Sequence, residues 1–231
     1  MENLQSDHLD TQNLYRDMQK RTGGEIYIGV VGPVRTGKST FIKRFMDVAV
    51  LPYMEDAAQK TRAQDELPQS AGGRTITTTE PKFIPQEAVE LKLAGEVTIR
   101  VRLVDCVGFM VEGAAGHLED GAERLVKTPW YDHEIPFTQA AELGTRKVIT
   151  DHSTIGVVVT TDGSFSDLPQ ETYLDAENQA ISELKKLHKP FLVLVNSSHP
   201  SSRTAREAAE RIEKQHSVAA MPVNCAQLSE E

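Results

Sequence analysis

The feature that most constrains this chain is the segment GPVRTGKS at residues 32–39. It fits the pattern G-x-x-x-x-G-K-[ST], in which a glycine-rich turn presents backbone N–H groups to a phosphate. The β-prone run EIYIGVV precedes it at residues 25–31, and a helical pattern follows at residues 39–50. A strand, a glycine-rich turn and a helix in this order are the context that the pattern requires. The sequence therefore predicts a P-loop.

Strand and helix patterns alternate along the rest of the chain. We expect a hairpin of strands at 88–93 and 98–104, strands at 154–159, 191–195 and 218–223, and helices at 139–149, 171–187 and 204–216. Such alternation is typical of a mostly parallel sheet with helices on both faces. The predicted fold is an α/β P-loop NTPase, a three-layer sandwich of GTPase-like topology with one antiparallel hairpin strand.

Length and composition favour a single globular domain. The 231 residues are 39% hydrophobic, enough for one sizeable core, and we expect an N-terminal arm at 1–22 and one domain at 23–231. The net charge of −9 argues against a nucleic-acid partner. We find neither a signal peptide nor an apolar run near the roughly 18 residues of a membrane span. Two cysteines without metal-ligand spacing indicate a reducing compartment, so a cytoplasmic location is expected.

The P-loop pattern assigns roles to individual residues. Lys38 places a positive charge at the β- and γ-phosphates, and the Ser39 hydroxyl is a candidate ligand of Mg²⁺. The positive end of the following helix favours the same anion. We expect these residues to contact the nucleotide: Gly32, Pro33, Val34, Arg35, Thr36, Gly37, Lys38, Ser39 and Thr40.

A second motif, Asp105-Cys106-Val107-Gly108, follows the strand expected at 98–104. Its D-x-x-G order is similar to the start of switch II in GTPase-like proteins. Asp105 is then a Mg²⁺-associated carboxylate, and the Gly108 N–H contacts the γ-phosphate. The alternative is an ordinary turn at a strand end. Phe109 stands where many GTPases carry the glutamine that orients the attacking water, so we expect slow hydrolysis.

The segment 52–85 is long, polar and rich in threonine, and we interpret it as a switch loop. One threonine of such a loop typically binds the metal. The candidates are Thr75, Thr77, Thr78 and Thr79, and spacing alone does not choose among them.

The sequence Asn196-Ser197-Ser198-His199 departs from the N-K-x-D motif of guanine-specific proteins. The aspartate of that motif accepts two hydrogen bonds from guanine, and neutral histidine offers no such pair of acceptors. We therefore expect ATP as the ligand, with Asn196 close to it. Residues 224–226 are a candidate for the last loop beside the base.

Several long segments resemble the stage IV sporulation protein A family, well beyond the P-loop motifs. They are RTGGEIYIGVVGPVRTGKSTFIKRFM, RAQDELPQSAGGRTITTTEPKF, RLVDCVGF, KTPWYDHEIPF and GTRKVITDHSTIGVVVTTDG, and the match spans roughly residues 21–196. The resemblance implies a fold related to translation-factor GTPases. It also implies that Lys38 is the phosphate-binding lysine, Asp105 the magnesium-associated aspartate, and Thr78 and Thr79 the paired threonines that sense nucleotide and support hydrolysis.

By this resemblance, the chain is a morphogenetic ATPase whose nucleotide cycle drives self-assembly of the spore coat basement layer. Implied partners are other copies, coat proteins and a small membrane-associated anchoring peptide, at the forespore surface in the mother-cell cytoplasm. The family's middle and C-terminal domains are not expected in this chain. Two alternatives remain: a GTP-dependent regulatory switch, and a scaffold that binds nucleotide without hydrolysing it.

Overall fold

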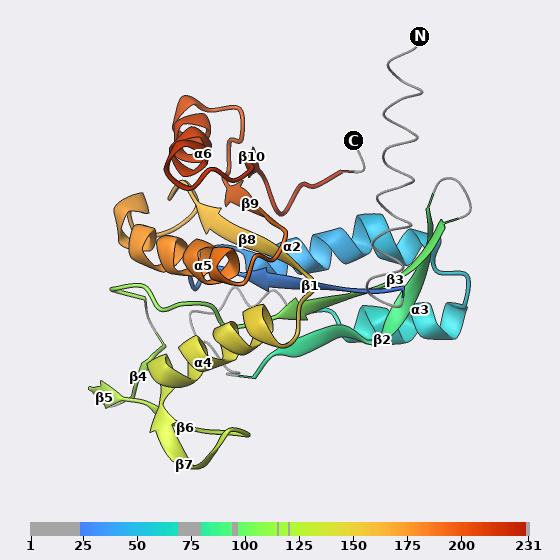
Figure 1. Cartoon of the computed structure of the whole chain (residues 1–231), viewed down its shortest axis with the longest axis horizontal. Coiled ribbons are helices and arrows are strands. Elements are labelled where there is room, and N and C mark those ends of the chain that lie inside the picture. Colours follow the sequence, from blue (N-terminus) through green and yellow to red (C-terminus); the bar gives the residue numbers. More distant parts are fainter. Residues whose placement is uncertain (1–23, 69–79, 94–96, 115, 120, 230–231) are drawn as a thin grey trace.

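A computed structural model describes residues 24–68, 80–93, 97–114, 116–119 and 121–229. Within these residues, six strands form one sheet in the order β10-β9-β8-β1-β3-β2 (Figure 1). Neighbouring strands are parallel except β2 and β3, which form the antiparallel pair. The strands are β1 (Glu25–Val31), β2 (Lys82–Leu93), β3 (Val97–Asp105), β8 (Ile155–Thr161), β9 (Phe191–Asn196) and β10 (Ala220–Val223).

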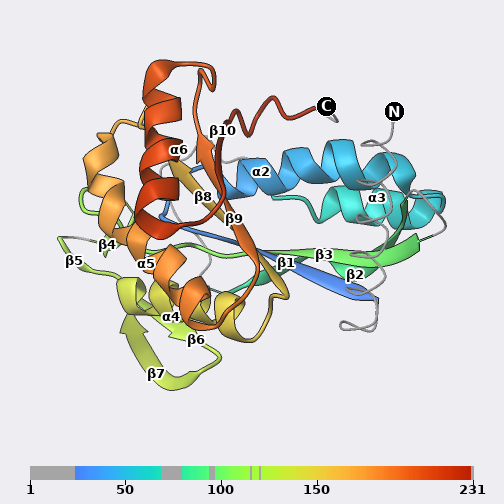
Figure 2. The same ribbon diagram turned by 45° about the horizontal axis from the view of Figure 1, so that its top comes forward.

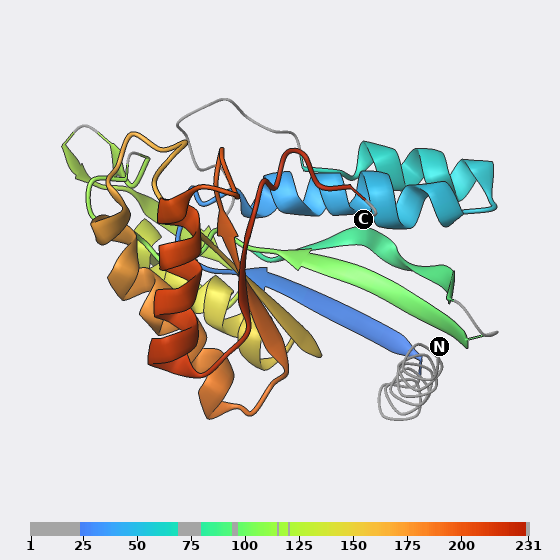
Figure 3. The same cartoon turned by 90° about the horizontal axis from the view of Figure 1, so that it is seen from above.

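Helices cover both faces of this sheet, which makes three layers (Figures 2 and 3). Helices α2 and α3 lie on one face, and α4, α5 and α6 lie on the other. Their bounds are α2 (Lys38–Phe45), α3 (Ala57–Asp65), α4 (Phe137–Thr150), α5 (Leu174–Lys186) and α6 (Arg203–His216). The predicted α/β P-loop sandwich with its hairpin strand is confirmed.

Alternating side chains of the central strands fill two cores. Val30 packs with Phe41 and Ile42 of α2, whereas its neighbour Val31 packs with Val148 of α4 on the opposite face. Successive side chains of a strand point to opposite faces, and a strand buried on both faces reads as a continuous apolar run. The run EIYIGVV therefore encodes a central strand, and its carboxyl end delivers the P-loop.

The prediction of an uninterrupted loop at 52–85 was wrong. After α2 the chain continues as a π-helical turn (Met46–Val50) and a 3-10 turn (Leu51–Tyr53), and α3 then occupies Ala57–Asp65. The Asp56 carboxylate caps α3 by accepting hydrogen bonds from the backbone N–H groups of Ala58 and Gln59. Strand β2 also begins earlier than expected, at Lys82. The expected arm at 1–22 lies outside the described residues.

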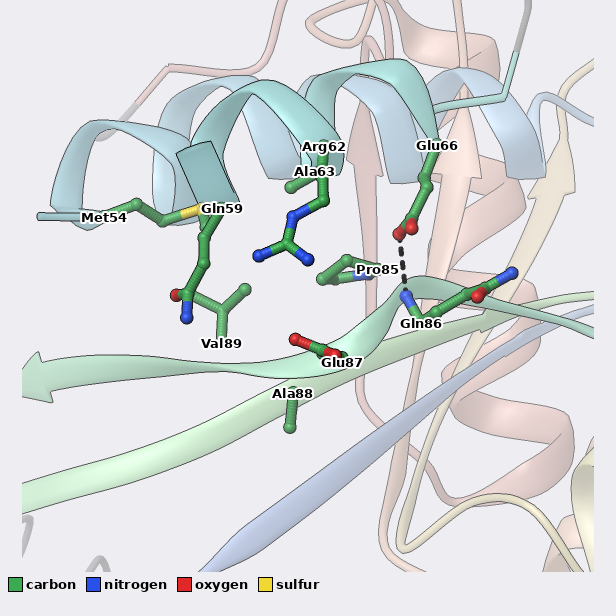
Figure 4. A pocket seen from close by; sticks show the side chains of 10 residues that line it. All are labelled: Met54, Gln59, Arg62, Ala63, Glu66, Pro85, Gln86, Glu87, Ala88 and Val89. Carbon is green, nitrogen blue, oxygen red and sulfur yellow. Dashed lines mark hydrogen bonds between the residues drawn. The ribbon is translucent and has the colours of Figure 1, made fainter. Parts of the chain in front are cut away.

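Helix α3 packs against β2 where the pairing of β2 with β3 is interrupted between Ile84 and Val89 (Figure 4). The Glu66 carboxylate accepts a hydrogen bond from the backbone N–H of Gln86, at 2.8 Å. A cavity of about 240 Å³ lies between the two elements, and no P-loop residue lines it. The cavity is therefore separate from the phosphate site.

Two small hairpins that the sequence did not predict lie between β3 and α4. They are formed by β4 (Leu118–Glu119), β5 (Ala122–Glu123), β6 (Leu125–Thr128) and β7 (Tyr131–Pro136), which project at the lower left of Figure 1. Their strands are short and mostly exposed, so no clear alternation of apolar and polar residues marks them. None of the described helices is long and apolar enough to cross a membrane.

Candidate nucleotide-binding site

Two glycines give the P-loop its shape. Gly32 has φ 129° and Gly37 has φ 96°, which is backbone that residues with a side chain rarely adopt. A Cβ atom at Gly32 would overlap the carbonyl oxygen of Val159, and one at Gly37 would overlap the Asn196 side chain. The turn into α2 is therefore compatible only with glycine at these two positions.

Two buried polar side chains fix the P-loop against neighbouring strands. The Thr36 hydroxyl lies 2.7 Å from the Val159 carbonyl oxygen of β8. Asn196 Nδ2 donates to the Thr36 carbonyl oxygen at 3.0 Å, and Asn196 Oδ1 accepts from the Cys225 backbone N–H at 3.0 Å. Asn196, expected beside the nucleotide, thus links the P-loop to the loop after β10.

Lys38 is almost completely buried, with 4% of its surface exposed. Its Nζ atom donates to the Pro33 carbonyl oxygen at 2.5 Å, across the P-loop. Burial lowers the pKa of this amine, while the acidic groups of Cys106 and Asp105 act in the opposite direction. A bound anion would further favour the charged form of this buried amine.

Asp105 lies at the end of β3 and contacts the start of α2. The Ser39 hydroxyl donates to Asp105 Oδ2 at 2.8 Å, while Oδ1 is out of solvent contact and has no hydrogen-bond partner among the described residues. Burial raises the pKa of this carboxyl, and the Ser39 hydrogen bond and the Lys38 charge lower it in part. An unsatisfied carboxylate oxygen beside a serine hydroxyl fits the oxygen ligands that Mg²⁺ prefers.

The D-x-x-G loop is docked on the P-loop. Phe109 N–H donates to the Gly32 carbonyl oxygen at 3.0 Å, and Val34 N–H donates to the Phe109 carbonyl oxygen at 2.9 Å. The Gly108 N–H, expected at the γ-phosphate, donates here to the Thr145 hydroxyl of α4 at 3.1 Å. The sequence reasoning did not identify Thr145, because its only signal was a threonine on the buried face of a helix.

The remaining predicted residues occupy different environments. The Phe109 side chain is 1% exposed and packs in the core on the α4 side of the sheet. Arg35 is exposed, with φ 60°, and Thr40 is half-buried on α2. The threonine candidates at 75, 77, 78 and 79 lie outside the described residues.

Exposed loops border the site beyond Asn196. His199 follows β9 and lines a cleft of about 420 Å³ with residues that follow β8, including Asp162 and Gln170. The loop after β10 does not line that cleft. In that loop, Ala226 N–H donates to the side-chain oxygen Oδ1 of Asn224 at 3.0 Å.

These contacts define what the site can hold. A buried lysine needs an anion, and an unsatisfied aspartate oxygen beside a serine hydroxyl needs a cation. The residues present fit a nucleotide polyphosphate with Mg²⁺.

Comparison with known proteins gives consistent matches. The profile of the family described as "Stage IV sporulation protein A, ATPase domain" matches residues 9–231. The protein named stage IV sporulation protein A of Clostridioides difficile (strain 630) is 50% identical over 219 residues, which cover 95% of this chain and 45% of that protein. The protein of the same name in Bacillus subtilis (strain 168) is 51% identical over 202 residues, covering 86% and 41%.

This chain thus spans less than half the length of these relatives. Among solved structures, a variant of a protein named SsGBP has a TM-score of 0.47 and 13% identity, and the match covers 94% of this chain and 55% of that one. The sheet order and the P-loop of this chain define its fold.

Proposed function

Because this chain belongs to the stage IV sporulation protein A family through its ATPase domain, we propose that it binds ATP with Mg²⁺ and hydrolyses it slowly at residues 32–40. The observation that carries this proposal is that the buried amine of Lys38, at the start of α2, and the unsatisfied Oδ1 of Asp105, at the end of β3, both lie beside the P-loop. Membership of an ATPase-domain family supports nucleotide hydrolysis in general.

In the proposed reaction each residue has a limited task. Lys38 holds the β- and γ-phosphate oxygens, and Ser39 and Asp105 hold the metal. When bound, magnesium ATP supplies the phosphoanhydride bond that water attacks and part of the charge neutralisation. We assign Thr78 as a further metal ligand, and Thr78 and Thr79 as the pair that supports hydrolysis, by the family resemblance. Gly108 would detect the γ-phosphate through its N–H.

The buried Phe109 supports slow turnover. Its side chain has no polar atom to hold a water molecule, and it packs in the core rather than at the phosphates. Correct placement of the attacking water accounts for much of the rate of related nucleotidases. A water-orienting group would then come from the threonine segment or from a second copy of the chain.

The proposed biological role is assembly of the spore coat basement layer, driven by the nucleotide cycle. The name of the relatives supports a role in sporulation. Self-association into polymers, contact with coat proteins, an anchoring peptide at the membrane and a position at the forespore surface are proposals from the same resemblance. Pelleting of the full-length protein with ATP, ADP, GTP or no nucleotide tests self-association into polymers. Pelleting that does not depend on ATP would contradict a polymer driven by the nucleotide cycle.

Phosphate release from ATP tests the enzymatic proposal. Lys38→Ala should abolish release, because the buried positive charge at the phosphates is removed. Lys43→Ala is the matched control, since Lys43 is an exposed lysine on the same helix. Equal turnover by both variants would contradict the proposal. A chain that binds ATP without releasing phosphate would be the non-hydrolysing scaffold, and preferential GTP turnover would indicate the regulatory switch.

A further inference from the structure

Asn224 covers the backbone donor of the loop that follows β10. Its Oδ1 atom accepts from Ala226 N–H at 3.0 Å, and its Nδ2 atom donates to the side-chain oxygen of Gln227 at 3.3 Å. The Ala226 N–H can only donate, so this contact fixes the orientation of the Asn224 amide, with the oxygen over the backbone N–H. Asn224 is half-buried and Ala226 is exposed, so this edge of the loop is open to a ligand.

Hydrogen bonds connect this loop to the phosphate site. Cys225 N–H donates to Asn196 Oδ1, and Asn196 Nδ2 donates to the carbonyl oxygen of Thr36 in the P-loop. In open α/β sheets, a nucleotide lies across the carboxyl ends of the strands. A nucleotide with its phosphates in the P-loop therefore extends toward the loops after β9 and β10.

Adenine and guanine differ in the group that they present at ring position 6. Adenine has an amino group, which donates, and guanine has a carbonyl oxygen, which accepts. If the Ala226 N–H faced this ring position without a partner, it would favour guanine. The Asn224 oxygen covers this donor and replaces it with an acceptor, and a carbonyl oxygen has two lone pairs, so one remains for a ligand.

We propose that Asn224 selects adenine, with its Oδ1 atom accepting a hydrogen bond from the 6-amino group. Guanine would place its O6 atom against the same oxygen, and two facing acceptors leave both without a donor. This inference rests on the proposed binding of ATP at the P-loop. The loss of the N-K-x-D aspartate at His199 explains weak guanine binding only, whereas Asn224 gives a positive preference for adenine.

The test compares two nucleotides and two variants. Purine riboside triphosphate lacks the 6-amino group and is otherwise ATP. The wild-type chain should bind it about tenfold more weakly than ATP, the effect of one hydrogen bond. Asn224→Ala should bind the two equally and should lower the preference for ATP over GTP by about tenfold or more. Competition with a fluorescent ATP analogue measures all of these affinities.

Two further variants serve as controls. Asn224→Asp keeps an oxygen at the same place and should retain discrimination against purine riboside triphosphate. Gln227→Ala removes only the partner of Nδ2 and should also retain it. Unchanged discrimination in Asn224→Ala, or loss of discrimination in Asn224→Asp, would overturn the assignment. Failure of the wild-type chain to prefer ATP over GTP would instead overturn the proposed function.

Discussion

The two ends of the candidate nucleotide site are built differently. At the phosphate end, Thr36 and Lys38 are 0% and 4% exposed, and glycine backbone forms the turn. At the proposed base end, Ser198 and Ala226 are exposed and belong to loops. A polyphosphate is common to all nucleoside triphosphates, and a fixed, buried cradle can bind it. Choice of base depends on a few exposed groups, which can change without disturbing the cradle.

The largest effect should follow a change of charge at the phosphate end. We expect Asp105→Asn to lower phosphate release by about two orders of magnitude or more, because a carboxylate ligand of the metal is lost. The same variant should be more stable than wild type in the absence of nucleotide and metal. Its side-chain oxygen can still accept from Ser39, and the carboxylate charge that burial disfavours is removed. Phosphate release and urea midpoints measure the two effects.

This gain in stability should depend on pH. Burial raises the pKa of Asp105, so the folded state binds this proton more tightly than the unfolded state does. The contribution of this carboxyl to the free energy of unfolding is therefore most favourable below its ordinary pKa. This contribution is lost as the pH rises through the raised pKa of the folded state. The difference between Asp105→Asn and wild type should be largest at neutral pH and should shrink in acid. A difference that grew in acid would contradict the burial argument.

Gly37→Ala tests whether the P-loop binds nucleotides with different bases equally well. A side chain at φ 96° is strained by about 1–3 kcal/mol, and its Cβ would also overlap Asn196. Affinities for ATP and GTP should fall together, by about tenfold or more. Gly121→Ala is the matched control, because Gly121 has φ 81° but, chain neighbours aside, no atom of the described residues lies within 4 Å of an added Cβ. A loss of affinity for only one of the two nucleotides would contradict the view that the phosphate end does not distinguish bases.

Asn196→Ala tests the connection between the two ends. It leaves the Thr36 carbonyl oxygen and the Cys225 N–H without their present partner, and we expect a loss of about 1–3 kcal/mol in the free energy of unfolding. Affinity for ATP should also fall, because the P-loop and the base loop lose their common support. Wild-type stability in urea unfolding would show that this bridge is dispensable.

Thr145→Val should have the smallest effect and tests the D-x-x-G loop. The valine keeps the shape of threonine but removes the acceptor of the Gly108 N–H, at a cost of about 1–2 kcal/mol in stability. With magnesium and a non-hydrolysable ATP analogue this cost should shrink, because the γ-phosphate would then accept from Gly108. Thr150→Val, at an exposed position of the same helix, should change stability by less than about 0.5 kcal/mol. An equal cost with ADP and with the ATP analogue would contradict a phosphate contact at Gly108.

The difference between the buried phosphate end and the exposed loops also explains which features the sequence could predict. The P-loop and the position of Asp105 follow from local patterns, because each motif sits directly at the end of a buried strand. The contacts of Thr145 and Asn224 depend on the packing of α4 and on the turn after β10, and no local pattern marks them. Helix α3 was missed because a polar, exposed helix lacks a strong apolar stripe, although Asp56 is a recognisable cap.

Binding of ATP and GTP to the wild-type chain, with magnesium and with a chelator, tests the central claim most directly. The account predicts that magnesium tightens the binding of both nucleotides, because the phosphate end does not distinguish bases. It also predicts that ATP binds more than about tenfold tighter than GTP, because the base end distinguishes adenine from guanine. Binding that is insensitive to magnesium, or GTP binding as tight as ATP binding, would contradict it.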